Sequence, residues 1–134
     1  MPRSDTRLTK ATLWECDFGS QEDVAQLLSV FYTNRSITDL TIHQITNLEG
    51  VALGTCLSNL MQNMPQLQCL ICSQGDLRVH GTRALHPGLR ANRTLKQLYI
   101  SSCKLGDGGF RIVADALVGN TTMQRILHST QFRD

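Results

Sequence analysis

Apolar residues recur along this chain in short segments of fixed internal spacing, and an asparagine precedes each segment from the second onward. These asparagines are separated by 29, 29 and 28 residues: Asn34, Asn63, Asn92 and Asn120. The clearest segment has apolar residues at its positions 1, 4, 6, 9 and 11: Leu95, Leu98, Ile100, Cys103 and Leu105. A repeat of this length is typical of solenoid proteins, in which each repeat forms one structural unit.

Four other segments follow the same spacing, completely or in part. The first and third read Leu8, Ala11, Leu13, Cys16, Phe18 and Leu67, Leu70, Cys72, Gly75, Leu77. The second has Asn47 in its last position, after Ile37, Leu40, Ile42 and Ile45. The fifth begins with Met123 and Ile126 and then has His128 where an apolar residue is expected. The repeats therefore cover approximately residues 8–36, 37–66, 67–94 and 95–122, with a partial repeat at 123–134.

Each repeat is expected to form a strand followed by a helix. Positions 4 and 6 alternate with their neighbours, as the inward-facing residues of a short strand do. A stripe at the i, i+3, i+4, i+7 spacing of an amphipathic helix follows. In the first, second and fourth repeats the stripe consists of Val24, Leu27, Leu28, Phe31, then Leu53, Cys56, Leu57, Leu60, and last Phe110, Val113, Ala114, Leu117. Ser20 and Asp23 resemble a capping box that opens the first helix.

One strand-and-helix unit cannot bury its apolar face alone, whereas stacked units share a continuous core. The sequence therefore predicts a single α/β domain over residues 1–134, which is a curved solenoid of about four and a half repeats. We expect parallel strands on its concave side and helices on its convex side.

The pattern resembles the leucine-rich repeat, in particular the ribonuclease-inhibitor type of about 28 to 29 residues. NOD-like receptors and Ran GTPase-activating proteins contain repeats of this type. The resemblance extends over about residues 8 to 130, and Cys16 and Cys103 match the family's cysteine at position 9. The residues that depart from the family at this position are Ile45 and Gly75. Pro87 falls within the expected third helix and is expected to shorten or kink it.

The composition agrees with one folded domain. The chain has 134 residues, of which 41% are apolar and 18% charged, and its formal charge is +2. Neither this charge nor any run of like charges indicates nucleic acid or a membrane surface as a partner. No segment reaches the roughly 18 consecutive apolar residues of a membrane span, and residues 1–10 lack the apolar stretch of a secretory signal. Five cysteines without disulfide-framework spacing favour free thiols, so we expect a cytoplasmic protein.

A glycine-rich segment, Gly106-Asp107-Gly108-Gly109, lies between an expected strand and an expected helix, as a phosphate-binding loop does. It lacks the spacing of the known phosphate loops. We expect Asp107 to cap the following helix instead, with the glycines easing a tight turn.

The motif Cys69-x-x-Cys72 resembles half of a zinc site or a redox pair. Residues three apart on a strand point to opposite faces, however, and no second pair stands at ligand spacing. We therefore expect Cys72 in the core and Cys69 facing outward, with no metal or cofactor.

Three of the repeated asparagines also belong to glycosylation sequons: Asn34, Asn92 and Asn120. Because they share one repeat position, we interpret them as residues that end a helix in the left-handed conformation. The alternative is a sugar acceptor in a secreted protein, which the missing signal disfavours.

Catalytic motifs are missing from the sequence. The four histidines are dispersed, and neither H-E-x-x-H nor G-x-S-x-G occurs. We therefore do not expect an enzyme.

The strand face that points away from the core is the candidate binding surface. Its residues are those at positions 3, 5 and 7 of each repeat: Lys10, Thr12, Trp14, Asp39, Thr41, His43, Cys69, Ile71, Ser73, Gln97, Tyr99 and Ser101. Adjacent parallel strands lie about 4.8 Å apart, so equivalent positions are expected to form ladders. Tryptophan and tyrosine are enriched at the hot spots of protein interfaces. The alternative for Trp14 is that it only covers the end of the first strand.

These observations lead us to expect a protein-interaction module whose concave face binds a protein partner. The resemblance to Ran GTPase-activating proteins gives a second hypothesis, a regulator of a small GTPase, which requires a stimulating arginine. The arginines available for this role are Arg78, Arg83, Arg90, Arg93 and Arg111. A third hypothesis is a fragment of a larger NOD-like sensor, in which uncapped ends at Leu8, Met123 and Ile126 favour self-association.

Overall fold

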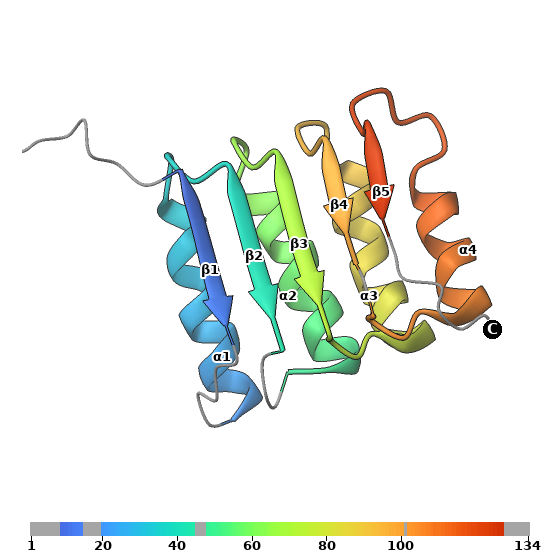
Figure 1. Ribbon diagram of the computed structural model, residues 1–134, viewed down its shortest axis with the longest axis horizontal. Coiled ribbons are helices and arrows are strands. Elements are labelled where there is room, and N and C mark those ends of the chain that lie inside the picture. Colours follow the sequence, from blue (N-terminus) through green and yellow to red (C-terminus); the bar gives the residue numbers. More distant parts are fainter. Residues whose placement is uncertain (1–8, 15–19, 45–47, 101, 128–134) are drawn as a thin grey trace, which may run out of the picture.

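The computed structural model describes residues 9–14, 20–44, 48–100 and 102–127. Within these ranges, five strands and four α-helices alternate along the chain (Figure 1). The strands are β1 (Lys10–Trp14), β2 (Asp39–His43), β3 (Cys69–Ser73), β4 (Gln97–Tyr99) and β5 (Arg125–Leu127). The helices are α1 (Gln21–Leu28), α2 (Gly50–Asn63), α3 (Arg78–Ala91) and α4 (Gly106–Ala116), and a 3-10 helix, η2 (Ser29–Thr33), follows α1.

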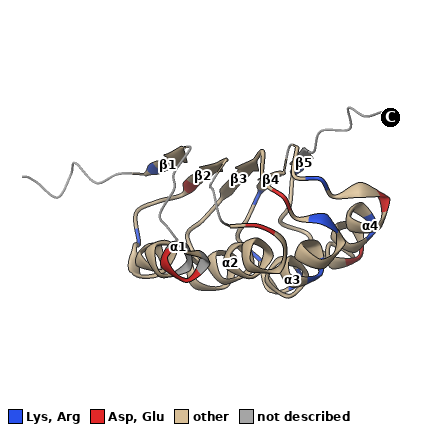
Figure 2. Cartoon of the chain, turned by 90° about the horizontal axis from the view of Figure 1, so that it is seen from below, with Lys and Arg blue, Asp and Glu red and all other residues tan. Residues whose placement is uncertain are grey.

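All five strands belong to one parallel sheet in the order β1-β2-β3-β4-β5. The helices lie together on one side of this sheet, so the molecule has two layers (Figure 2). We call the other side of the sheet the open face. The predicted alternation of strands and helices and the parallel sheet are confirmed, and the arrangement is compatible with a solenoid of the leucine-rich-repeat kind.

The core lies between the sheet and the helices. The predicted inward-facing residues of the three central strands are buried: Leu40, Ile42, Leu70, Cys72, Leu98 and Ile100. The predicted stripe of α2 packs against them with at most 5% of any residue exposed: Leu53, Cys56, Leu57 and Leu60. Burying one large aliphatic side chain contributes about 1.5–3 kcal/mol, so the two layers stabilise each other.

Helices α2 and α3 pack closely because glycines lie between them. A Cβ atom at Gly54 would overlap the backbone carbonyl oxygen of Gly81, and one at Gly88 would overlap the backbone and side chain of Ser58. Any larger residue at these positions would push the two helices apart. The small residues therefore set the distance between the second and third repeats.

Pro87 lies inside α3 and does not end it, so the prediction that it shortens the helix is wrong. The helix continues for 14 residues, through Ala91. Both Pro87 and Arg83, whose carbonyl group loses its helical hydrogen-bond donor, are exposed. Water can bond to that carbonyl, while Leu85 and Leu89 are buried and anchor the helix to the core.

The apolar stripe of α4 differs from the prediction. Val113 is buried as predicted, but Phe110 is 43% exposed and Ala114 is exposed. Gly109 is buried instead. A Cβ atom at Gly109 would lie 3.0 Å from Thr82 Oγ1. The missing side chain thus lets α4 approach α3, and the neighbouring Phe110 turns outward.

The first helix is shorter than its predicted stripe. Leu28, the last residue of α1, is fully buried, and Phe31 packs on the core from η2 while half-buried. The predicted capping box is confirmed. Ser20 N–H donates to Asp23 Oδ2 at 3.4 Å, and Asp23 N–H donates to Ser20 Oγ at 3.2 Å. Predicted positions that lie outside the described residues are Leu8, Cys16, Phe18, Ile45, Asn47 and His128, together with the side chain of Val24.

At the other end of the sheet, the apolar residues Met123 and Ile126 are half-buried and pack against the core. The hypothesis of fully uncapped apolar ends is therefore not supported at this end.

The repeated asparagines do not adopt the left-handed conformation that we predicted. Asn34 and Asn92 are extended, with φ of −76° and −73°. Their side-chain oxygen atoms accept hydrogen bonds from the backbone N–H groups two and three residues later, at 2.6 to 3.0 Å, and Asn120 does the same. Such side-chain bonds stabilise a turn, here the turn that leads into the next strand. Asn63 differs because it lies in α2 and donates to the carbonyl of Asn59.

Candidate functional site

Parallel pairing places the predicted outward positions side by side on the open face. The ladder at the carboxyl ends of the strands contains Trp14, His43 and Ser73. The central ladder contains Thr12, Thr41, Ile71 and Tyr99. The ladder at the amino ends contains Lys10, Asp39, Cys69, Gln97 and Arg125. The remaining predicted position, Ser101, lies outside the described residues.

Three side chains interact directly at the carboxyl ends of the first three strands. The rings of Trp14 and His43 stack with their centroids 3.9 Å apart and their planes inclined by 8°. On the next strand, Ser73 Oγ lies 2.5 Å from His43 Nδ1. His43 is thus held from both sides, whereas Trp14 remains 59% exposed. The result is an ordered aromatic surface.

The central ladder adds an apolar patch beside this pair. Ile71 and Tyr99 are direct neighbours on β3 and β4, and both are half-buried. The Tyr99 hydroxyl donates to Gln97 Oε1 at 3.3 Å, which holds the phenol ring along β4. The open face therefore combines aromatic, aliphatic and polar groups, and the structure brings the predicted residues together.

Cys69 lies on the open face as predicted, but it is only 7% exposed. Its ladder neighbours Asp39 and Gln97 flank it. Burial raises the pKa of the Cys69 thiol, and the negative charge of Asp39 raises it further. The prediction that the Cys69 side chain faces outward is confirmed, but the expectation that its thiol is exposed is wrong.

Cys72 and Cys69 do not converge on one site, because Cys72 lies in the core against Cys103. The sulfur atoms of Cys72 and Cys103 are 3.7 Å apart, and the Cys103 thiol donates to the Cys72 carbonyl oxygen at 3.0 Å. The hydrogen bond with Cys103 and burial raise the pKa of Cys72 well above its usual value. In the described part of the chain, no group of three or more His, Cys, Asp or Glu residues could hold a metal ion.

The glycine-rich segment belongs to the start of α4. Gly106 is the first residue of the helix, with φ of +69°, and Asp107 lies in the first turn. The N-cap residue is Leu105, so the prediction that Asp107 caps the helix is wrong by position. A carboxylate in the first turn still favours the helix by interacting with its dipole.

The sequon asparagines are part of the turn structure. Asn92 is 7% exposed, and its amide nitrogen donates to the carbonyl oxygen of Met61 at 3.0 Å. With the oxygen atom also bound by backbone N–H groups, this amide cannot carry a sugar in the folded chain. The repeat interpretation is favoured over the sugar acceptor, although its conformational reason was wrong.

The arginines considered for GTPase regulation do not form one site. Arg78 pairs with Asp76 at 2.8 Å. Arg93 donates to the carbonyl oxygens of Arg90 and Asn92 at 2.8 and 2.9 Å. All five are exposed, and they are distributed over α3, α4 and the turn after α3.

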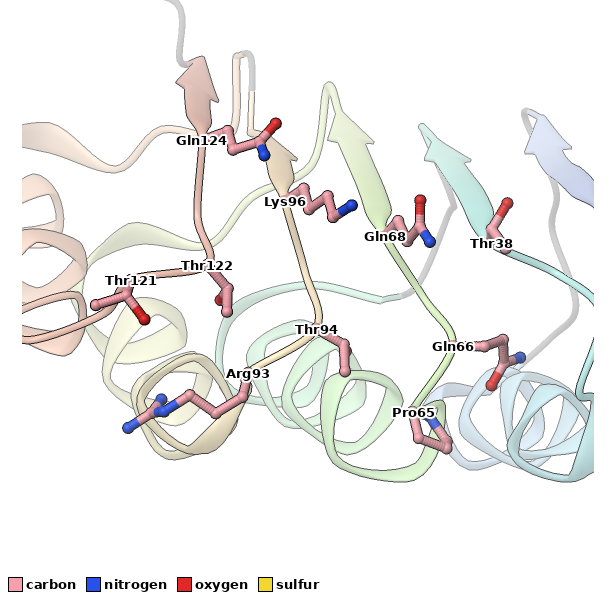
Figure 3. Close-up of a pocket in the computed structure, with 10 residues that line it drawn as sticks. All are labelled: Thr38, Pro65, Gln66, Gln68, Arg93, Thr94, Lys96, Thr121, Thr122 and Gln124. Atoms are coloured by element: carbon pink, nitrogen blue, oxygen red, sulfur yellow. The ribbon is translucent and has the colours of Figure 1, made fainter.

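A groove that we did not predict crosses the amino ends of the strands (Figure 3). Its volume is about 490 Å³, and its lining residues come from the turns that precede β2, β3, β4 and β5: Thr38, Pro65, Gln66, Gln68, Arg93, Thr94, Lys96, Thr121, Thr122 and Gln124. Four of these stand immediately before a strand, outside the alternating positions that we used to define the binding face. A periodic search of that position in the sequence could have found them: Thr38, Gln68, Lys96 and Gln124.

A second hollow of about 440 Å³ lies at the carboxyl ends of the strands, and its lining includes Glu49, Asp76 and Lys104. Asp76 contacts both Arg78 and Lys104, the latter at 3.9 Å. Opposite charges therefore already neutralise each other at this end.

Comparison with known proteins identifies the fold. No family model and no curated protein matches this chain. Its structure is similar to that of the leiomodin-1 actin-binding site 2, with a TM-score of 0.78 over 95% of this chain and 73% of that chain. The sequence identity is 15%, so the likeness shows a shared fold. None of the described helices is long and apolar enough to cross a membrane.

Proposed function

We propose that this chain is a non-catalytic protein-interaction module that binds a protein partner through the open face of its sheet. In this proposal the chain is a leucine-rich repeat solenoid of the ribonuclease-inhibitor type, and the open face is its concave side. The support is the set of polar, charged and aromatic side chains that the strands align there. A broad surface of this mixed composition resembles a protein interface more than an enclosed small-molecule site.

The observation that carries the proposal is the stacked pair of Trp14 and His43. Trp14 follows Leu13, which packs against the core, and its own side chain is 59% exposed, so packing of the core does not explain it. Its neighbour is fixed by Ser73. A ring that is already ordered loses little conformational entropy when a partner covers it. Tyr99 and Ile71, one ladder away, extend the anchor surface.

The leiomodin-1 segment is named as an actin-binding site. We infer from this that a partner of the protein class suits the fold, and actin is one candidate to test. An identity of 15% does not transfer the partner itself.

The experiment compares three forms of the chain as bait for cytosolic proteins and for purified actin. The test variant combines Trp14→Ala, His43→Ala and Tyr99→Ala. The control variant removes exposed apolar groups away from the open face by Val51→Ala, Phe110→Ala and Val118→Ala. We expect the unmodified chain and the control to capture the same partner and the test variant to lose it, with unchanged circular dichroism. Equal capture by all three folded forms contradicts the assignment to the open face.

A further inference from the structure

The groove at the amino ends of the strands has regular dimensions. The strand register aligns Asp39, Cys69, Gln97 and Arg125. The residues that precede them therefore lie next to one another at the amino ends of the strands: Thr38, Gln68, Lys96 and Gln124. Three strand intervals of about 4.8 Å span roughly 14 Å. An extended polypeptide rises about 3.3 Å per residue, so roughly four residues fit across the four turns.

The charge of the groove has one sign. Two of its lining residues are cations, Arg93 and Lys96, and none of the described lining residues is Asp or Glu. Lys96 lies centrally and its side chain extends along the groove toward Gln68 (Figure 3). Its ammonium group has no ion-pair partner among the described residues. Asp39, which follows the lining residue Thr38 in the sequence, accepts a hydrogen bond from the Thr38 hydroxyl at the far end of the groove.

The uncharged lining groups can bond to a peptide backbone. Glutamine side chains carry both a donor and an acceptor, and three of them line the groove: Gln66, Gln68 and Gln124. Gln66 Nε2 donates to the Asn34 carbonyl at 2.7 Å, but its Oε1 is buried and has no hydrogen-bond partner within the described chain. A buried acceptor without a donor is costly, and a peptide N–H group in the groove supplies one only if the Gln66 amide turns toward it.

We propose that this groove binds an extended acidic peptide segment of a protein partner. A carboxylate of the segment pairs with Lys96, and its backbone bonds to the glutamine and threonine side chains that cross the sheet edge. The groove borders the amino-end ladder of the open face and lies away from Trp14, which is at the carboxyl ends of the strands. The proposal therefore does not depend on binding by the surface around Trp14 and His43.

The test uses a fluorescein-labelled peptide of four glutamates with the full chain, followed by fluorescence anisotropy at low ionic strength. Lys96→Glu is expected to weaken binding about tenfold or more, which corresponds to one lost charge-assisted hydrogen bond. The matched control is Arg83→Glu, which makes the same charge change at an exposed position of α3. It is expected to change the affinity less than about twofold, because the formal charge of the chain is only +2 and produces a weak overall field.

Two further measurements make the result specific. Amide chemical shifts of Gln68, Thr94 and Gln124 are expected to move on addition of the peptide, while the indole of Trp14, the single tryptophan, stays unchanged. A peptide of four glutamines is expected not to bind. Equal weakening by Lys96→Glu and Arg83→Glu would mean general charge attraction and would overturn the proposal. Displacement by equimolar inorganic phosphate would also overturn it, in favour of a simple anion site. If Lys96→Glu does not fold, Lys96→Gln serves in its place.

Discussion

The amide nitrogen of Asn92 donates a hydrogen bond to the carbonyl oxygen of Met61 at 3.0 Å and so connects two neighbouring repeats. The carbonyl belongs to the last turn of α2, where it has no helical donor. The oxygen atom of the same side chain accepts hydrogen bonds from the backbone N–H groups of Thr94 and Leu95. One buried side chain therefore satisfies backbone groups at the end of one helix and at the start of the next strand.

Replacing Asn92 with alanine is expected to destabilise the fold by about 2–4 kcal/mol, because several buried backbone groups lose their partners at once. The measurement is urea denaturation followed by circular dichroism. Asn63→Ala is the control at the equivalent repeat position. Asn63 is exposed and bonds within its own helix, so its loss is expected to cost less than about 1 kcal/mol. Similar losses for both variants would contradict the role assigned to Asn92.

The asparagine repeat illustrates how far the sequence predicts this structure. Its period gives the units, and the spacing of Leu40 and Ile42, or of Leu70 and Cys72, gives the strands and their buried face. The physical role of the asparagines could not be derived in the same way. The left-handed cap and the side-chain turn occupy the same position after a helix, and only hydrogen-bond geometry separates them.

Left-handed residues begin three of the helices. Gly50, Arg78 and Gly106 have φ of +60°, +53° and +69° at the first position of α2, α3 and α4. Only Arg78 carries a Cβ, which is unfavourable in this conformation. We expect Arg78→Gly to be more stable than Arg78→Ala by about 1 kcal/mol. Both variants lose the ion pair with Asp76, so the difference in their stability reports the backbone conformation alone.

At exposed Arg83, inside α3, the order of the glycine and alanine variants is expected to reverse, because alanine favours a helix interior by about 1 kcal/mol. Thermal denaturation of all four variants checks both orders.

Burial of Cys56 predicts a pH dependence of stability. Burial raises the pKa of the Cys56 thiol in the folded chain, whereas an unfolded cysteine titrates at about 8.5. Between these two values the folded state retains a proton that the unfolded state releases. The contribution of the protonated thiol to stability is therefore fully present below a pH of about 8.5 and is lost as the pH rises toward the folded pKa.

The prediction is checked by urea denaturation at several pH values from about 7 to 10, a range that includes the unfolded thiol pKa. Cys56→Ala is expected to be less stable at neutral pH and to show a smaller decline with increasing pH. Val113→Ala, which removes buried apolar volume without a titrating group, is expected to keep the original decline. An unchanged decline in Cys56→Ala would mean that other groups produce it.

As with the repeated asparagines, the sequence predicted only part of the candidate site, and the reason is physical. Alternation along a strand fixes which side chains face outward, and parallel pairing then aligns Trp14 with His43. The alternation of residues along a strand predicts the direction of a side chain but not its exposure. It therefore gave no sign that Asp39 and Gln97 flank Cys69 and help to bury it. The alternation also applies only within the strand. The groove around Lys96 is built from turns whose side-by-side position follows from the register alone.

The glycines between α2 and α3 give the sharpest test of the packing. A methyl group at Gly54 would collide with the backbone carbonyl of Gly81, which cannot move without shifting the whole helix. Gly54→Ala is therefore expected to cost about 3 kcal/mol or more, although alanine is the better helix former. Gly108 lies in α4, and a methyl group there would meet only the Val79 side chain, at 3.1 Å. Because that side chain can yield slightly, Gly108→Ala is expected to be neutral or to stabilise the fold by up to about 1 kcal/mol. The two alanine variants should thus change the urea midpoint in opposite directions or leave the second unchanged. If Gly54→Ala is as stable as the unmodified chain, α2 and α3 are not held as closely together as the packing of the second and third repeats requires.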